Sequence, residues 1–262
     1  MFRALAKCFV LPIAVLLSTA SVAGAAAVPV VAAASDLQYA LTEVAAAFAR
    51  ASGRSVKLSF GSSGNFVRQI IQGAPFEVFF SADEAYVREL EDRGLTPDGG
   101  ALYALGRLAV YVSNRSPIKA DAKLEGLAAA LNDGRLRKLA IANPEHAPYG
   151  RAAREVLMNR SLWQKAQGHL VMGENISQAA QFAASGSVEA GLIAYSLALS
   201  GQMSKAGTYA LLPADWHAPL RQRAVLLNGA GDTARAFYAY AQSPSARGVF
   251  EKYGFALPAT GH

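Results

Sequence analysis

Short apolar runs alternate with amphipathic stretches along the chain from Val28 onward. The runs Val28–Ala33, Ser55–Phe60 and Glu77–Phe80 predict three short strands. Helices are predicted after them at Leu37–Ala51, where one face carries apolar residues at every third or fourth position, at Asn65–Gln72, and from the capping-box pattern Ser81-Ala-Asp-Glu84 to about Glu89. Three strand–helix units in succession predict a parallel sheet with helices on its faces.

A second α/β set follows a longer predicted strand, Arg107–Ser113, which leaves the first unit. Its predicted elements are the helices Leu124–Leu131, Gly150–Met158 and Ser177–Ala184 and the strands Lys138–Ala142 and Gly191–Ala194. Towards the end, Gln222–Leu227 predicts a strand, and Thr233–Tyr253 is helical except at Pro244. We therefore expect two α/β lobes, one of residues 28–106 and 218–262 and one of residues 107–217.

The first 27 residues have the order of a secretory signal peptide. Arg3 and Lys7 supply positive charge, the apolar run Phe9–Leu17 follows, and small residues crowd the stretch up to Ala27. The apolar run is shorter than the roughly 20 residues that a membrane span needs, so a retained anchor is the less favoured alternative. We expect residues 1–27 to be removed and the mature chain to reside in the periplasm.

Cysteine content and charge exclude several classes of function. Cys8 is the only cysteine and lies in the signal segment, so disulfides, thiolate catalysis and cysteine metal sites are excluded from the mature chain. Without Arg3 and Lys7 the formal net charge falls from +6 to +4, and the basic residues are dispersed. Nucleic acid is therefore not an expected partner.

Two serine turns share one design that suits an anion. A predicted strand ends at Ser35 just before a helix, and another ends in the turn Gly61-Ser-Ser-Gly64 before the next helix. A helix N-terminus presents unpaired N–H groups and the positive end of the helix dipole, and serine hydroxyls add donors. Ordinary N-capping explains either turn alone. Together, at the ends of successive strands, they favour an anion site in one crevice.

The second lobe contains comparable segments. Asn143–Gly150 joins a predicted strand to a helix, and because Pro148 has no N–H, the first free donors there belong to Tyr149 and Gly150. Glu174-Asn-Ile-Ser177 opens another predicted helix. Tyr195 stands at the end of a predicted strand, where a phenol can donate to a bound oxygen, although a tyrosine at a lobe boundary is the simpler interpretation.

An ordered set of short segments resembles a known family. They are Ala32-Ala-Ala-Ser35, Ser59-Phe-Gly-Ser-Ser63, Gly73-Ala-Pro75, Phe80-Ser-Ala-Asp83, Asn143-Pro-Glu-His146 and Lys252-Tyr-Gly-Phe255. In this order they resemble the periplasmic molybdate-binding proteins of ABC transporters, and the resemblance runs from about Val28 to Phe255. It implies the two-lobe periplasmic binding protein fold of type II, with one dehydrated oxyanion, molybdate or tungstate, held between the lobes by neutral donors.

The resemblance also implies roles for five residues. Ser35 and Ser63 would donate through hydroxyl and main-chain groups, Tyr149 and Ile176 through main-chain N–H groups, and Tyr195 through its phenol. It implies no cofactor and no free metal-cation site, a monomeric chain, and an ABC transporter permease in the inner membrane as partner.

Two positions depart from the family pattern. Some members carry alanine where Tyr149 stands, so its ring is expected only to line the cleft wall. Asp36 follows the first serine where members often carry an uncharged residue. Because a carboxylate facing a dianion is repulsive, we expect Asp36 to point away from the site as a helix cap.

Three alternatives remain open at the level of sequence. Neutral donors also suit sulfate, thiosulfate or a small organic anion, since cavity size decides between them. An exported hydrolase lacks support, because the turn at Gly61 is one residue short of Gly-x-Ser-x-Gly and the four histidines are scattered. His146 is expected to bond to backbone in a loop. An iron site would need adjacent ligand tyrosines, whereas Phe237, Tyr238, Tyr240, Val249, Phe250 and Tyr253 fit a pair of core helices.

Overall fold

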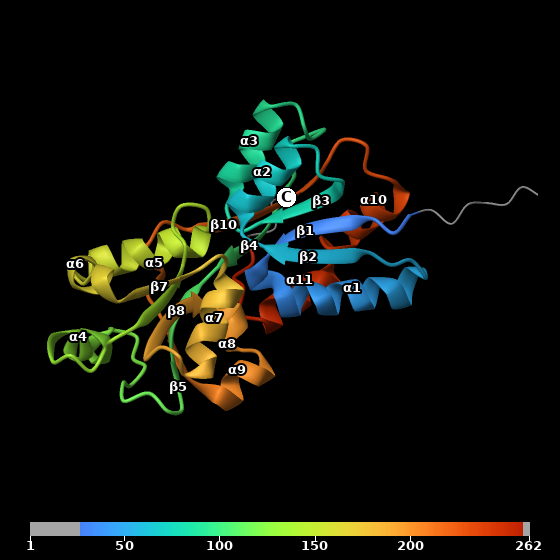
Figure 1. Ribbon diagram of the computed structural model, residues 1–262. Helices are drawn as coiled ribbons and strands as arrows, with labels where there is room; N and C mark the ends of the chain where they lie inside the picture. The colour runs from blue at the N-terminus through green and yellow to red at the C-terminus, as the bar shows by residue number, and fades with distance from the viewer. Residues whose placement is uncertain (1–26, 259–262) are drawn as a thin grey trace, which may run out of the picture.

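The computed structural model describes residues 27–258, which form two sheets in two adjacent lobes (Figure 1). This arrangement confirms the predicted two-lobed α/β architecture. The predicted signal peptide, residues 1–27, lies outside the described residues except for Ala27. Within the described part of the chain, no helix is both long enough and apolar enough to cross a bilayer.

The first lobe is built on a five-stranded sheet in the order β2-β1-β3-β10-β4. Its strands are β1 (Val30–Ala34), β2 (Lys57–Gly61), β3 (Phe76–Ser81), β4 (Ala101–Gly106) and β10 (Leu220–Leu226). The prediction of a parallel sheet is correct for β1, β2 and β3, but β10 runs antiparallel to both β3 and β4. The sheet is mixed because β10 returns from the other lobe instead of following a crossover helix.

The second lobe repeats this plan in the strand order β7-β6-β8-β5-β9. Its strands are β5 (Leu108–Ser113), β6 (Leu139–Ala142), β7 (Leu170–Gly173), β8 (Ala190–Ala194) and β9 (Gly207–Leu211). Strands β4, β7 and β9 were not predicted from the sequence. Their residues are mainly alanine, leucine, methionine and glycine, which have little β-propensity, so these strands form through pairing with neighbours.

Helices cover both sheets, and α2, α3, α7, α9 and α11 begin behind the capping side chains Ser62, Asp83, Asn175, Ser200 and Ser243. The α-helices are α1 (Gln38–Ser52), α2 (Ser63–Ile71), α3 (Glu84–Asp92), α4 (Glu125–Asn132), α5 (Pro148–Asn159), α6 (Trp163–Ala166), α7 (Ile176–Ser185), α8 (Tyr195–Ala198), α9 (Gly201–Ala206), α10 (Asp232–Tyr240) and α11 (Pro244–Lys252), with short 3-10 turns η1 (Ser35–Leu37), η2 (Gln167–His169) and η3 (Ala214–Trp216). The predicted break at Pro244 is confirmed, since Pro244 begins α11 behind the cap Ser243. The predicted cap of α3 at Ser81 is wrong: Ser81 ends β3, and Asp83 accepts the Ala85 N–H instead.

Apolar residues on the two faces of the first sheet make two separate cores. Along β1, Val31 and Ala33 face a core shared with α1, α10 and α11, while Ala32 faces a core shared with α2 and α3, as strand periodicity requires. Phe237 lies fully buried in the first of these cores, where its ring centroid is 5.4 Å from that of Phe48. The aromatic residues of α10 and α11 therefore serve the core, as predicted from their spacing.

The chain passes between the sheets at two neighbouring points. Arg107 alone separates β4 from β5, and residues 212–219 lead from β9 back to β10. The two crossings are joined, because Leu212 donates its N–H to Leu108 at 3.0 Å and the Arg107 guanidinium donates to the Leu212 carbonyl at 3.2 Å. The two lobes are therefore linked by two connections that are hydrogen-bonded to each other.

Gly150 allows the start of α5 to pack directly against the end of β6. Replacing this glycine tests how closely the two elements approach each other. A Cβ there would stand 2.3 Å from the Ala142 carbonyl oxygen, so Gly150→Ala must displace backbone. We expect a loss of about 3 kcal/mol in the free energy of unfolding, measured by urea denaturation.

Gly248→Ala is the matched control. Gly248 lies inside α11 with nothing within 4 Å of a built Cβ, so alanine should stabilise the protein by about 0.5–1 kcal/mol. Equal stability of the two variants would contradict the close approach of α5 to β6.

Candidate functional site

A small pocket lies between the lobes, where β1 and β2 of the first lobe end and where α5 and α7 of the second begin. Four of the five predicted site residues line it together: Ser35, Ser63, Tyr149 and Ile176. They come from four segments that are far apart in the sequence. The remaining lining residues are Ala34, Asp36, Gly61, Ser62, Ala82, Ala147 and Pro148.

Three helix N-termini converge on this pocket. Ser63 is the first residue of α2, Ile176 is the first of α7, and Tyr149 is the second of α5, after Pro148. N–H groups in the first turn of a helix have no acceptor within that helix, and each helix adds the positive end of its dipole. The three residues therefore bring main-chain donors and positive potential to one point, which is the arrangement that binds anions.

The two predicted serine hydroxyls add donors in different ways. The Ser63 oxygen accepts the Ala82 N–H at 3.0 Å, which leaves its own proton to be donated. The Ser35 hydroxyl already bridges the lobes, since it donates to the Asn175 side-chain oxygen at 3.1 Å and accepts the Ser177 N–H at 3.2 Å. A bound anion would compete with Asn175 for the Ser35 proton.

Ser62 and His146 were not predicted as members of the site. The Ser62 oxygen caps α2 and lies 2.9 Å from Nδ1 of His146, while the His146 carbonyl accepts the Gly64 N–H at 3.0 Å. The expectation that His146 bonds to backbone is therefore incomplete, because its ring bonds a serine of the other lobe. Burial lowers the pKa of His146, and nearby Glu174 opposes the shift. The signal for Ser62 was its place beside Ser63 in the turn.

The expectation that Asp36 acts as a helix cap is wrong, and Asp36 belongs to the pocket lining. Its residue is only 1% exposed and lines the pocket, and the start of α1 has no side-chain cap. One carboxylate oxygen accepts the Gln222 amide at 2.6 Å, and the other has no hydrogen-bond partner. Burial raises the pKa of Asp36 to about 6, although the Gln222 amide and the Tyr149 hydroxyl beside it oppose the shift.

Tyr195 does not line the pocket. It begins α8, its N–H donates to the Arg107 carbonyl at 2.9 Å, and its ring packs edge-on against Tyr209 with centroids 5.8 Å apart. Tyr149 brings a phenol to the site region instead: its hydroxyl lies 3.1 Å from the Gln222 amide nitrogen beside Asp36. The Tyr149 ring is fully buried, so it does more than line a cleft wall.

A side-chain clasp on the α3–α5 side joins the lobes next to the pocket. Arg151 of α5 forms an ion pair with Asp83, which caps α3, and donates to the Tyr86 hydroxyl at 2.9 Å. Its guanidinium also lies over the Tyr86 ring, 5.2 Å from the centroid. The clasp closes the lobes without placing a cationic side chain in the pocket lining.

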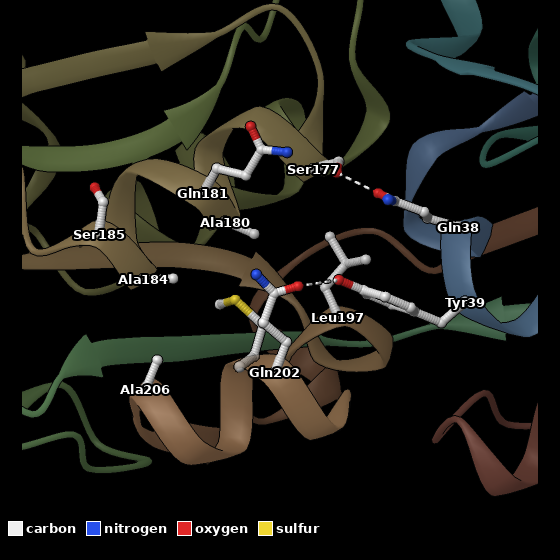
Figure 2. A pocket seen from close by; sticks show the side chains of 11 residues that line it. Gln38, Tyr39, Ser177, Ala180, Gln181, Ala184, Ser185, Leu197, Gln202 and Ala206 are labelled. Atoms are coloured by element: carbon white, nitrogen blue, oxygen red, sulfur yellow. Dashed lines mark hydrogen bonds between the residues drawn. The ribbon is translucent and has the colours of Figure 1, made fainter.

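A second, larger cavity of about 310 Å³ also lies between the lobes. It is lined by the start of α1 from the first lobe and by helices α7, α8 and α9 from the second. Figure 2 shows two bonds that span it, from Ser177 to Gln38 at 2.6 Å and from Tyr39 to Gln202 at 3.4 Å. Its lining is uncharged and includes Gln38, Ser177 and Gln202 from the first turns of α1, α7 and α9. Of the two, only the smaller pocket is lined by the predicted donor residues Ser35, Ser63, Tyr149 and Ile176.

The smaller pocket has a free volume of about 10 Å³, close to the least that one water molecule requires. An oxyanion can occupy it only when the lobes or the surrounding side chains move apart. Among residues 27–258, no group of three or more histidine, cysteine or carboxylate side chains is placed to hold a metal ion.

Comparison with known proteins agrees with this architecture. The family model described as bacterial extracellular solute-binding protein matches residues 29–256. The chain is 37% identical over 216 residues to the molybdate-binding protein ModA of Rhodobacter capsulatus, covering 81% of this chain and 82% of that one. It is 35% identical over 230 residues to ModA of Azotobacter vinelandii, covering 87% and 89%.

A solved structure gives the same result. The periplasmic molybdate-binding protein of Azotobacter vinelandii superposes with a TM-score of 0.79 at 30% sequence identity, over 88% of this chain and 99% of that one. The match confirms the predicted periplasmic binding protein fold. With a family model that covers nearly all described residues, the chain belongs to the bacterial extracellular solute-binding proteins.

Proposed function

We propose that this chain is the exported binding component of an ABC importer and that it captures molybdate or tungstate between its lobes. The observation that carries the proposal is the convergence of three helix N-termini and two serine hydroxyls on one interlobe pocket whose lining holds no cationic side chain. The proposed donors are Ser35, Ser63, Tyr149 and Ile176. Tyr195 is left out because its ring packs on Tyr209 away from the pocket.

Neutral donors suffice for a dianion in such a pocket. Charge-assisted hydrogen bonds to preorganised N–H and O–H groups are stronger than bonds between neutral groups, and they replace the hydration that the anion loses. A pocket of donors also disfavours a protonated oxyanion, whose own O–H would face a donor. This selects fully deprotonated dianions, such as molybdate, tungstate and sulfate, over hydrogen phosphate, which is a dianion that still carries an O–H.

The choice of molybdate or tungstate among dianions rests on the relatives. The proteins from Rhodobacter capsulatus and Azotobacter vinelandii carry the name molybdate-binding protein, and each aligns with more than four fifths of this chain. The periplasm as location is supported by the solved Azotobacter vinelandii protein, which is described as periplasmic. A binding role without catalysis or cofactor, and an inner-membrane permease as partner, are part of the proposal. We also propose that the binding protein acts as a monomer.

Binding and closure form one cycle in this proposal. The anion gains contacts with both lobes only when they are closed, so its binding favours the closed state. The joined connections at Arg107 and Leu212 act as the hinge, and the Arg151 clasp adds contacts that exist only in the closed form. The closed form would be the one that the permease recognises.

The serine donors provide the first test. We expect Ser35→Ala and Ser63→Ala each to weaken molybdate binding by about 10- to 100-fold, because each removes a hydrogen bond to a charged group, about 1.5–3 kcal/mol. The measurement is calorimetric titration of ligand-stripped protein with molybdate, tungstate, sulfate and phosphate.

Ser52→Ala is the matched control for these variants. Ser52 donates to the Phe48 carbonyl at the far end of the 15-residue helix α1, about 20 Å from the pocket, so its loss should leave affinity unchanged. Tight sulfate binding without molybdate binding would replace the substrate but keep the site. Absence of heat with every anion, from folded protein, would refute the proposed function.

The clasp provides a second, independent test. We expect Asp83→Asn and Arg151→Met each to weaken anion binding about two- to fivefold, since a half-exposed ion pair contributes up to about 1 kcal/mol to the closed state. Asparagine keeps an oxygen that can cap α3. The double variant should lose less than the two single losses combined.

The sign of the Asp83→Asn effect separates closure from long-range electrostatics. Removing a carboxylate near an anion site strengthens binding if only the electric field matters, but weakens it if the clasp stabilises closure. Arg93→Met is the control: it breaks an exposed ion pair between Glu89 of α3 and Arg93, the residue that follows the helix, and should change affinity little. Stronger binding by Asp83→Asn would rule out the clasp.

A further inference from the structure

We propose that Asp36 is a proton-carrying donor of the anion pocket, so that capture of a dianion takes up one proton at this carboxyl. The inference rests on the proposed function, and it adds a residue and a proton to the same site. On binding, the Asp36 carboxylate accepts a proton from solvent and its new O–H donates to an anion oxygen; on release the proton returns to solvent.

The geometry of the carboxyl carries the inference. Asp36 is 1% exposed and shares the pocket lining with Ser35 and Ser63. Oδ2 accepts the Gln222 amide at 2.6 Å, whereas Oδ1 is buried without a partner. A buried, unpartnered carboxylate oxygen is costly, and a proton on it removes the charge and creates a donor on a residue that lines the pocket.

No neighbouring group supplies a compensating positive charge. The carboxyl is faced by Gln222 from β10, Tyr103 from β4 and Tyr149 from α5, while Ser196 of α8 donates to the Asp36 carbonyl at 2.8 Å. Burial and the Asp36 charge raise the pKa of both tyrosines well above the usual value, so both stay neutral. Within the described chain, no lysine, arginine or histidine forms an ion pair or hydrogen bond with Asp36.

The titratable groups closest to this region, Arg107 and His146, form their hydrogen bonds with partners other than Asp36. The Arg107 guanidinium follows β4 but donates to the Leu212 carbonyl. On the α2 side, the His146 ring bonds Ser62 and lies 3.5 Å from Glu174, so His146 is the one histidine that must be controlled for in a pH experiment.

A dianion in the pocket favours the protonated form of Asp36. Burial already raises the pKa of this carboxyl to about 6, and a like charge within hydrogen-bond distance raises it further. Between the pKa of the free protein and the higher pKa of the complex, binding takes up a proton. Affinity then falls as the pH rises, by up to tenfold per pH unit.

The decisive experiment is calorimetric titration of the stripped, full mature chain with molybdate from about pH 5.5 to pH 8.5, in buffers of different ionisation enthalpy. For the unmodified protein we expect proton uptake that approaches one per anion above neutral pH, and affinity that weakens up to tenfold per unit above about pH 6. Asp36→Asn, whose amide is a permanent donor, should bind without this uptake and with nearly constant affinity. His146→Gln should keep the slope of the unmodified protein, whatever its absolute affinity.

Stability of the anion-free protein gives a second readout. Asp36 binds its proton more tightly in the folded protein than in the unfolded chain, where the pKa is near 3.8. Its contribution to the free energy of unfolding is therefore largest below about pH 4 and declines as the pH rises through about 6. The urea midpoint of Asp36→Asn relative to the unmodified protein should rise across this window.

Several outcomes would overturn the inference. Molybdate binding without proton uptake would refute it and leave the proposed function intact, and so would a slope that disappears in His146→Gln but persists in Asp36→Asn. Folded Asp36→Asn that no longer binds would also refute it, because asparagine supplies the donor. Absence of binding by the unmodified protein to every anion would refute both proposals.

Discussion

The first N–H groups of a helix have no acceptor within that helix, and in this protein three helices direct such groups to one place. Helices α2, α5 and α7 begin beside the same interlobe pocket, with Ser63, Tyr149 and Ile176 in their first turns. The rest of the fold serves this convergence: parallel strands β1 and β2 end at one edge of the first sheet, and the second lobe brings α5 and α7 to face it. In the proposed function, closure of the lobes surrounds the anion with donors that no single lobe provides.

Asp36 shows how the same closure creates a constraint. The carboxyl belongs to the turn after β1, and burial between Gln222 and Tyr149 leaves it without a cationic partner. In an open crevice water would solvate this charge, but in the closed pocket the charge is costly beside any anion. Protonation resolves the conflict, because the neutral carboxyl joins the surrounding donors. Anion capture, lobe closure and proton uptake are then linked through one side chain.

Relatives and geometry support different parts of the proposed function. The fold and the convergent donors indicate an anion held between two lobes, and they do so from contacts in this chain alone. The identity of the anion rests on the names of proteins that are 35% and 37% identical to it. The serine and clasp variants test whether these residues bind the anion and stabilise closure. Titration with the panel of anions tests which anion the protein binds.

Sequence alone determined the parts of this protein that depend on local physics. Periodicity placed β1 and α1, Pro244 placed the helix break, and the serine turns before two helices pointed to Ser35 and Ser63, which line the pocket of the proposed anion site. Only the tertiary structure decided the rest. Strands β4, β7 and β9 have weak propensity and form through pairing, Tyr195 turns to Tyr209, and Asp36 faces the pocket instead of capping α1. These features depend on what lies across a sheet or a lobe boundary, and residues 36, 149 and 222 acquire their shared environment only when the chain folds.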